Sequence, residues 1–339
     1  MKTALIGLGM VAGTYGDAIR NAADLSLARV YARSPDARDA FLADWPDLGA
    51  AAAGSIQSIA DDPGIDFVIL ATPPNARAEI IASMAAAGKP LLMEKPVERT
   101  LAAATALVET CEAANVPLGI MLQHRARPAA AELKRQVAGL GDLLAVEINV
   151  PWWRPQSYYD APGRGSYDRD GGGVLISQAI HTLDLVISLA GPVAEVSAMA
   201  ATTGFHQMES EDFVCAGLRF GNGAVGQLFA STASFPGRGE TITLHHRRGS
   251  AHLEAGMVRI DRQDGTCEVI GNAASSGAGA DPMAFTSDWH RSVIEDFAAA
   301  IRDGRPPLVS GRDALVVHRL ITALEMSAAS GSRVAPGDL

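Results

Sequence analysis

The sequence is poor in cysteine, in clustered basic residues and in long hydrophobic runs. Its three cysteines, Cys111, Cys215 and Cys267, are far apart and lack CxxC spacing, which argues against a disulfide framework or a zinc site and indicates a reducing compartment. The 28 Lys and Arg residues are outnumbered by 38 Asp and Glu, and the formal charge of -10 argues against a nucleic-acid partner. No hydrophobic run reaches the length of a membrane span and no signal-peptide pattern opens the chain, so we expect a cytoplasmic protein with no membrane partner.

Hydrophobic residues, by contrast, make up 48% of the 339 residues and charged residues only 19%, which indicates a well-filled globular core. This length suffices for two domains of roughly 100–200 residues each. Strands that alternate with helices, followed by strands of alternating polarity, predict an α/β protein. We expect a doubly wound, parallel Rossmann domain over 1–124, an α+β domain with a mostly antiparallel sheet over 125–310, and a C-terminal helix over 311–339 that packs on the first domain.

A dinucleotide-binding motif lies at the start of the chain. A short apolar run leads into GLGMVA, residues 7–12, and the segment that follows has helical spacing. In this GxGxxA pattern Gly7 permits a tight turn, Gly9 lets the backbone approach a pyrophosphate, and Ala12 allows close packing of the helix, whose start offers N–H groups to phosphates. The residues of this loop that we expect to bind the cofactor are Gly7, Leu8, Gly9, Met10 and Val11.

The end of the second predicted strand bears on which nucleotide is bound. An NAD enzyme usually carries an acidic residue here that binds the ribose hydroxyls, and this chain has Ala32 in that position. Arg33, Ser34 and Arg38 follow, and guanidinium and hydroxyl groups suit a 2′-phosphate. NADP(H) is therefore favoured. NAD(H) stays possible, because Asp36 offers an acidic group one turn later and Arg33 would then be merely exposed.

Polar turns follow the later strands of the same half. The strand over 67–71 runs into TPPN, the strand over 91–93 into EKP, and the strand over 118–122 into Gln123. Ligands of open α/β sheets bind at the carboxyl ends of the strands, so Lys95 would be held near the cofactor, where it can orient a substrate hydroxyl or share its proton. An ordinary surface lysine is the other interpretation. The residues expected to line the cofactor here are Thr72, Pro73, Asn75, Glu94, Lys95 and Gln123.

The second part of the chain has runs of alternating polarity between 144 and 261, joined in part by glycine-rich turns such as Gly221-Asn222-Gly223. These runs predict a mostly antiparallel sheet, with one helix over 173–190 inserted early. Residues 271–281 form a low-complexity loop. Helical periodicity returns over 288–301 and 312–331, and we expect these helices to pack on the first domain.

A second group of residues suited to catalysis follows the glycine triplet 171–173. The helix predicted after the glycines, which would let its start approach a ligand, carries Ser177, Gln178, His181 and Asp184. Ser177 and His181 are four residues apart and would share a face, with Asp184 three residues further on. Histidine is suited to accept a hydroxyl proton near neutral pH, and an alcohol must lose that proton when a hydride leaves its carbon. The alternative is a core histidine satisfied by Asp184.

Between these motifs lies a loop rich in Pro and Gly that contains more than half of the Trp and Tyr residues. Its aromatic and basic residues are Trp152, Trp153, Arg154, Tyr158, Tyr159, Arg164 and Tyr167. Aromatic faces and guanidinium groups suit a polyhydroxylated or carboxylated substrate, although a structural plug or an oligomer contact would use the same residues. The expected substrate-binding residues are Lys95, Arg154, Tyr158, Arg164, Tyr167, Ser177, Gln178 and His181.

The order of these motifs resembles that of the Gfo/Idh/MocA oxidoreductases, the glucose–fructose oxidoreductase and inositol dehydrogenase family. The motifs that carry the resemblance are GLGMVA, ATPPN, MEKP, GGGVLISQAIHTLDL and IEDFAAAIRDGRPPLVSGRDAL, which extend over essentially the whole chain. The resemblance implies a Rossmann domain, a C-terminal domain with a large open sheet, and Lys95 and His181 as the catalytic pair. His181 would be the general acid and base, and Lys95 would support the substrate oxygen.

Two residues depart from the pattern of the family. Many members have Asp or Asn where this chain has Ser177, which leaves Asp184 or Gln178 to orient the imidazole. Members also often have His where this chain has Arg77.

The activity implied by the resemblance is hydride exchange between NAD(P) and a hydroxyl-bearing carbon of a sugar, sugar acid or cyclitol. Two other functions stay open: NAD-dependent glycoside hydrolysis by redox elimination, and non-catalytic sensing of a nucleotide or sugar. The resemblance also implies a homodimer or homotetramer formed through the C-terminal sheet. No metal ion is expected.

Overall fold

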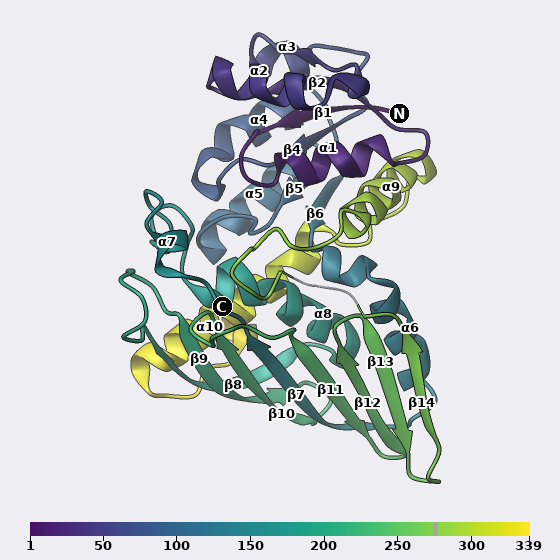
Figure 1. The fold of residues 1–339 in the computed structure, drawn as a ribbon, viewed down its shortest axis with the longest axis vertical. Coiled ribbons are helices and arrows are strands. Elements are labelled where there is room, and N and C mark those ends of the chain that lie inside the picture. The colour runs from purple at the N-terminus through teal and green to yellow at the C-terminus, as the bar shows by residue number, and fades with distance from the viewer. Residues whose placement is uncertain (274–276) are drawn as a thin grey trace. The chain divides into compact units, whose positions relative to one another are not determined.

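The computed structural model describes residues 1–273 and 277–339, and the chain folds into two compact units (Figure 1). The first unit comprises Met1–Ala126 and Thr286–Leu315, and the second comprises Arg127–Phe285 and Val316–Leu339. Residues 286–310 therefore belong with the N-terminal half, which confirms the packing expected for the helix over 288–301 but corrects the boundary of the substrate domain expected over 125–310. Most of the last helix belongs to the second unit and not to the first. Helical periodicity shows that such a segment has a buried face, but not which sheet that face packs on.

The first unit is built on a six-stranded parallel sheet with the order β3-β2-β1-β4-β5-β6. Its strands are β1 (Lys2–Ile6), β2 (Ser26–Tyr31), β3 (Ala51–Ala52), β4 (Phe67–Leu70), β5 (Leu91–Glu94) and β6 (Leu118–Met121). The strand order reverses between β1 and β4, and doubly wound sheets bind their ligands at the carboxyl ends of strands beside such a reversal. The predicted doubly wound fold is confirmed.

The helices of the first unit are α1 (Ala12–Arg20), α2 (Pro35–Asp44), α3 (Ile56–Ala60), α4 (Ala78–Ala86), α5 (Leu101–Ala113) and α9 (Asp288–Asp303). Strands β4, β5 and β6 are buried at every position, as is typical of parallel strands covered on both faces. Ser34, Ser55 and Thr100 precede α2, α3 and α5, and each side chain accepts a hydrogen bond from a backbone N–H of the first turn. The chain therefore marks these helix starts locally.

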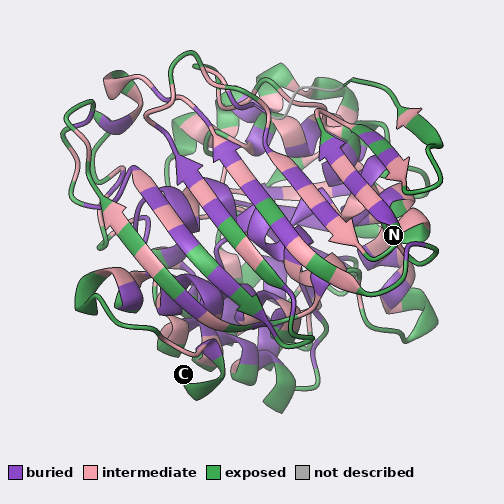
Figure 2. Cartoon of the chain, turned by 90° about the horizontal axis from the view of Figure 1, so that it is seen from below, coloured by how far each residue is buried: buried purple, intermediate pink, exposed green. Residues whose placement is uncertain are grey.

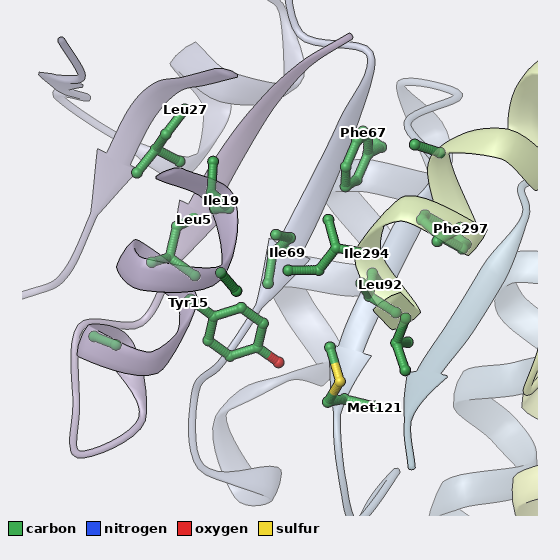
Figure 3. Close-up of a cluster of buried hydrophobic side chains, with 14 of the residues drawn as sticks. Leu5, Tyr15, Ile19, Leu27, Phe67, Ile69, Leu92, Met121, Ile294 and Phe297 are labelled. Atoms are coloured by element: carbon green, nitrogen blue, oxygen red, sulfur yellow. The ribbon is translucent and has the colours of Figure 1, made fainter. Parts of the chain in front are cut away.

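Helix α9 packs on the first sheet although it follows the second sheet in the sequence. Figure 3 shows Ile294 and Phe297 of α9 among Phe67 and Leu92 of the strands. The rings of Phe67 and Phe297 meet edge to face with 5.6 Å between their centroids. Gly119 of β6 faces the same helix, and a Cβ atom there would lie 2.7 Å from the ring of Phe297. Helix α9 is thus an integral part of the core of the first unit.

The second unit is built on an eight-stranded sheet with the order β14-β13-β12-β11-β7-β10-β9-β8. Its strands are β7 (Leu143–Pro151), β8 (Val193–Ala201), β9 (Phe213–Phe220), β10 (Val225–Ser231), β11 (Thr241–His246), β12 (Gly249–Glu254), β13 (Met257–Arg262) and β14 (Cys267–Gly271). Neighbouring strands are antiparallel, except that β7 and β10 are parallel. The predicted sheet is confirmed, but β14 was missed because this mostly exposed edge strand has no alternation of polarity.

The two faces of the second sheet differ in exposure. Along β7, Val146, Ile148 and Val150 are buried whereas Glu147 between them is exposed, and Figure 2 shows the same alternation on neighbouring strands. The helices that belong to this unit are α6 (Pro128–Val137), α7 (Gln156–Tyr159), α8 (Ile180–Ala190) and most of α10 (Gly311–Ser330). Helix α6 packs on β12, β13 and β14, and α8 packs on β7. These two helices lie on one face of the sheet, and Figure 2 shows the other face.

Part of the loop expected over 271–281, residues 274–276, lies outside the described residues. Gly271 itself ends β14. Within the ranges 1–273 and 277–339, no helix is both long and apolar enough to cross a membrane.

Candidate functional site

The nucleotide-binding motif forms the turn between β1 and α1. Gly7 has a φ of +101°, a left-handed conformation that favours glycine, and its N–H donates to the carbonyl of Tyr31 at 2.9 Å. A Cβ atom at Gly7 would lie 2.6 Å from the carbonyl carbon of Ala71 and 2.7 Å from the nitrogen of Thr72. The turn after β1 therefore packs directly on the turn after β4, which only glycine permits.

The outer side of the same turn is open. A Cβ atom at Gly9 would meet no atom of the described chain within 4 Å. Met10 is exposed, and Val11 begins α1 without a side-chain hydrogen bond to the helix. No acidic residue lies in the first turn of α1 to repel an anion. An open glycine beside an uncapped helix start fits the pyrophosphate of a dinucleotide.

The three residues expected at the 2′-phosphate have different surroundings. Ser34 caps α2 by accepting a hydrogen bond from the N–H of Ala37 at 3.3 Å. Arg38 is half-buried and donates from Nη1 to the carbonyl of Ala53 at 3.1 Å. Arg33 is exposed and forms no ion pair with any residue that the structure describes. Arg33 is therefore the cation best able to meet a phosphate, whereas Ser34 and Arg38 also serve the fold.

The turns after β4, β5 and β6 carry the residues expected around the nicotinamide. Pro73 and Asn75 are exposed, and Lys95 is half-buried where the chain leaves β5. Thr72 Oγ1 and Gln123 Oε1 are buried and have no hydrogen-bond partner within the described part of the chain. Because buried polar atoms are nearly always hydrogen-bonded, these two atoms point to a ligand that completes them.

Glu94 holds the backbone of Lys95. Its side chain is buried, with Oε2 accepting from the N–H of Lys95 at 3.0 Å and Oε1 accepting from the hydroxyl of Tyr15 at 2.9 Å. His290 Nε2 lies 3.7 Å from the same Oε1. Burial alone raises the pKa of Glu94, but the interaction with His290, the charge of Lys95 and the hydrogen bond from Tyr15 outweigh burial, so this pKa lies below its usual value. Glu94 is thus held as a carboxylate.

In the second unit, Glu211 organises the start of the helix that carries His181. Its Oε2 accepts from the N–H of Gly173 at 3.1 Å, its Oε1 accepts from Leu175 at 3.0 Å, and its backbone carbonyl accepts from Val174 at 2.8 Å. A Cβ atom at Gly173 would lie 1.8 Å from the carbonyl oxygen of Glu211. The third glycine of the triplet is therefore required by a contact within the protein, and not by the approach of a ligand as expected.

This helix begins with a π turn over Leu175–Ala179, which precedes α8. Ser177 and Gln178 lie in the π turn, and His181 lies in the regular helix. The shared face expected for Ser177 and His181 stays a prediction, since the π turn ends between these two residues. His181 and Asp184 keep α-helical spacing, and both are buried. Single π turns within helices are frequent at functional sites.

Gln178 is the second polar residue of this helix start. It is 4% exposed, and its Oε1 has no hydrogen-bond partner in the described chain. An acceptor without a donor, three residues before the imidazole of His181, suits a ligand that carries hydroxyl groups.

Arg154 has a structural role that the sequence pattern did not reveal. It is 2% exposed, and its Nη atoms donate to the carbonyls of Trp153, Gly277 and Gly279 at 2.5–2.8 Å. The guanidinium carbon also lies 5.3 Å from the centre of the Trp152 ring. Because these carbonyls already accept hydrogen bonds from both Nη atoms, the guanidinium of Arg154, which was expected to bind substrate, instead stabilises the conformation of the loop.

The other residues expected to bind substrate in this loop are more accessible. Arg164 lies 3.6 Å from Asp170, and its guanidinium lies over the ring of Tyr158 at 4.9 Å. Tyr167 is 49% exposed, and its backbone N–H donates to Glu209 at 3.1 Å. Tyr167 is thus exposed, whereas Arg164 and Tyr158 are half-buried.

A cavity of about 310 Å³ lies within the second unit, lined in part by Glu209, Glu211, Glu325 and Tyr167. A Cβ atom at Gly172 would lie 3.3 Å from Glu325 Oε1, which is buried without a partner in the described residues. Burial, followed by the charge of Glu211, raises the pKa of Glu325 to about 8. Glu325 therefore carries a proton at neutral pH.

Sequence reasoning missed Tyr15, His290 and Glu211, and it treated Arg77 only as a departure from a family pattern. Arg77 immediately precedes α4, where a positive charge is unfavourable because it opposes the helix dipole. This unfavourable position is the one sequence feature that indicates a role for Arg77 other than starting the helix. Nothing in the spacing of the other three residues connects them with Lys95 or His181.

The fold and the site define a dinucleotide-binding protein with a second, α+β domain. A model of the oxidoreductase family with an NAD-binding Rossmann fold matches residues 1–122, and a model of the GFO/IDH/MocA C-terminal domain matches residues 131–252. The two models cover well over half of the chain, which belongs to the Gfo/Idh/MocA oxidoreductase family. The resemblance drawn from the sequence motifs is confirmed.

Relatives of known activity support this assignment. D-Apiose dehydrogenase of Paraburkholderia graminis is 27% identical over 80% of this chain and 72% of its own length. Levoglucosan dehydrogenase of Pseudarthrobacter phenanthrenivorans is 27% identical over 82% of both chains. The structure of the WlbA dehydrogenase from Bordetella pertussis, in complex with NADH and UDP-GlcNAcA, superimposes with a TM-score of 0.82 at 27% identity, and covers 99% of this chain and 98% of that one.

Replacing Glu325 by Gln is expected to flatten the pH dependence of thermal stability. The folded state keeps the Glu325 proton up to about pH 8, whereas the unfolded chain releases it near the ordinary glutamate pKa. Wild-type stability should therefore fall as the pH rises through this window, and Gln, which has no proton to lose, should remove that contribution. The Tm of Glu325→Gln, measured by scanning fluorimetry, should exceed that of the wild type by about 3–6 °C at about pH 9 but not at about pH 5.

Glu209→Gln is the matched control, because Glu209 lines the same cavity but is exposed. It should keep the wild-type slope. A Glu325→Gln profile parallel to that of the wild type would contradict the assignment of the proton to Glu325.

Proposed function

We propose that this oxidoreductase is an NAD(P)-dependent dehydrogenase or reductase that acts on a hydroxyl-bearing carbon of a sugar, sugar acid or cyclitol. The observation that carries the proposal is the turn after β5, where the buried carboxylate of Glu94 binds the backbone N–H of the half-buried Lys95. The same unit contains the glycine turn after β1, which is open to a dinucleotide at Gly9. The sugar dehydrogenases among the relatives support this substrate class.

Residues of the first unit would hold the nucleotide. The backbone of Gly9 and the start of α1 would bind the pyrophosphate, and the exposed turn at Pro73 and Asn75 would line the nicotinamide with Thr72 and Gln123. The buried polar atoms of Thr72 and Gln123 that lack partners in the described chain fit this role. A bound nicotinamide supplies the chemistry of accepting or returning a hydride.

The chain itself would position the substrate hydroxyl and move its proton. His181 would act as the general acid and base at this oxygen, because imidazole changes its protonation near neutral pH. The Lys95 ammonium would donate a hydrogen bond to the same oxygen and stabilise negative charge on it. Gln178, Arg164, Tyr158 and Tyr167 would bind other polar groups of the substrate.

Lys95→Ala and His181→Ala are each expected to lower kcat/KM by about 10²–10⁴-fold, because each removes a group that binds or transfers a proton at the reacting oxygen. The measurement is the absorbance change of the reduced nicotinamide across a panel of polyols, sugar acids and cyclitols. Lys134→Ala, at an exposed lysine on α6, is the control and should retain activity.

Turnover that survives both substitutions would refute the catalytic roles. Glycoside cleavage with a retained cofactor and no net absorbance change would instead identify a redox-elimination hydrolase. Nucleotide binding without turnover of any member of the panel would favour a sensor.

We further propose that NADP(H) is preferred over NAD(H), with Arg33 as the main contact of the 2′-phosphate. Arg33→Ala should lower kcat/KM for NADP by about 10–100-fold, because a charge-assisted hydrogen bond to a phosphate contributes about 1.5–3 kcal/mol. The value for NAD, measured on the same preparation, should stay within about threefold, since NAD lacks the phosphate. Equal losses with both nucleotides would reject this contact.

The protein is proposed to be cytoplasmic and to form a homodimer or homotetramer through the exposed face of the eight-stranded sheet. The register pairs Met199 with Cys215, Cys215 with Phe229, and Phe229 with Asn149, so these side chains share one face. Val225 lies on the same strand and face as Phe229, and Met199 and Val225 are 57% and 49% exposed. The free thiols of the three cysteines support a reducing compartment.

The double substitution Met199→Glu and Val225→Glu is expected to shift the assembly toward the monomer, because it places charges where apolar surface would be buried. Light scattering coupled to size-exclusion chromatography measures the mass. Leu308→Glu, at an exposed apolar residue of the first unit, should leave the mass unchanged. A wild-type mass equal to that of a single chain would contradict the proposed assembly.

A further inference from the structure

Arg77 is a buried cation that none of the catalytic roles uses. It is 1% exposed and is the largest of the fully buried side chains in the described chain. It lies between the short helix Pro74–Ala76 and α4, directly after the turn that would line the nicotinamide. Burying a guanidinium is costly unless its donors are satisfied, so its contacts define its role.

All the donors of Arg77 that form hydrogen bonds donate to backbone carbonyls of two separate turns. Nε and Nη2 donate to the carbonyl of Thr72 at 3.1 and 2.7 Å, in the turn after β4. Nη1 donates to the carbonyl of Glu94 at 2.6 Å, and also to the carbonyls of Pro96 and Val97, in the turn after β5. One planar group thus connects the carboxyl ends of two neighbouring strands.

The carbonyls that Arg77 binds lie on both sides of Lys95. Glu94 precedes Lys95 and Pro96 follows it, while the N–H of Lys95 itself donates to the carboxylate of Glu94 at 3.0 Å. That carboxylate is held in turn by the hydroxyl of Tyr15. The backbone of Lys95 is therefore fixed through its neighbours' carbonyls by Arg77 and through its own N–H by Glu94.

The other end of the connection reaches the nucleotide loop. The carbonyl of Thr72 is bound by Arg77, and the nitrogen of Thr72 lies where the Cβ atom of any residue other than glycine at position 7 would clash. A continuous set of backbone contacts thus runs from Gly7 through Thr72 and Arg77 to the turn that carries Lys95.

The charge of Arg77 persists in this buried position. Burial lowers the pKa of Arg77 to about 10, while Glu94, Tyr15 and Glu98 act against this effect. A pKa of about 10 leaves the group protonated at neutral pH, so every nitrogen remains a donor. Lysine has a single nitrogen and histidine has two, and neither can span both turns as the planar fork of arginine does.

We infer that Arg77 is a positioning residue that sets where Lys95 stands relative to the bound nucleotide. The inference rests on the proposed function, in which Lys95 acts beside the nicotinamide. In this role Arg77 does not bind the nucleotide itself. Its hydrogen bonds hold the turn after β5, which carries Lys95, against the turn after β4, which would line the nicotinamide.

The chain has only four lysines, Lys2, Lys89, Lys95 and Lys134, so the position of Lys95 can be followed by chemical labelling. Limiting acetic anhydride is applied with and without saturating NADPH or NADH, and mass spectrometry gives the labelling of Lys95 relative to the exposed Lys134. In the wild type the nucleotide should slow the labelling of Lys95 by about tenfold or more, since it would cover the amine.

In Arg77→Lys and Arg77→His this protection should fall by at least about threefold at full nucleotide occupancy, because the turn of Lys95 is no longer locked. On any substrate found in the panel, kcat should fall by about 10–100-fold with little change in KM for the nucleotide. Arg127→Lys, which alters a buried arginine paired with Glu240 in the second unit, should leave the protection of Lys95 as in the wild type.

Three other outcomes of these experiments would count against the inference or against the proposed function. Unchanged protection in either folded Arg77 variant would overturn the inference and leave the proposed function intact. Loss of cooperative melting in both variants would show that Arg77 serves stability alone and would also overturn it. Absence of protection in the wild type would instead refute the placement of Lys95 beside the nucleotide, which belongs to the proposed function.

Discussion

The first unit depends on the contact between Gly7 and the backbone of Ala71 and Thr72. Strands β1 and β4 are parallel neighbours at the point where the strand order reverses, and the turns that leave them are pressed together. No side chain fits between these turns, because a Cβ atom would lie 2.6 Å from a carbonyl carbon. This contact brings the phosphate-binding loop and the expected nicotinamide turn to one edge of the sheet, where doubly wound proteins bind nucleotides.

The two residues proposed for catalysis are supported in complementary ways. Lys95 lies in a turn whose carbonyls are bound by a buried cation, Arg77, whereas His181 lies on a helix whose first N–H groups are bound by a buried carboxyl side chain, Glu211. In both cases an ionisable side chain from elsewhere in the chain satisfies backbone groups that secondary structure leaves open. Such buried polar groups are tolerated only when they are hydrogen-bonded, which also limits how far the segments they hold can move.

The same principle explains why a functional interpretation of polar residues from sequence is incomplete. Arg154 stands in a loop with the composition of a substrate site, yet its donors bind the carbonyls of Gly277 and Gly279. Thr72, Gln123 and Gln178 have the opposite character, because each has a buried polar atom without a partner in the described residues. An arginine satisfied by the protein contributes to the fold, and an unsatisfied buried acceptor or hydroxyl indicates a place for a ligand.

The sequence by itself determined the family, the parallel sheet with its glycine turn, the antiparallel second sheet, and the positions of Lys95 and His181 at the ends of local motifs. These features follow from patterns within about a dozen neighbouring residues, where propensity and periodicity act. Only the tertiary structure decided which residues of the first core α9 contacts, that most of α10 belongs to the second unit, that a π turn precedes α8, and that Arg77, Tyr15 and Glu211 hold the segments that carry Lys95 and His181. These contacts join residues as far apart as Phe67 and Phe297, and they depend on which buried faces and unpaired backbone groups meet once the chain has folded.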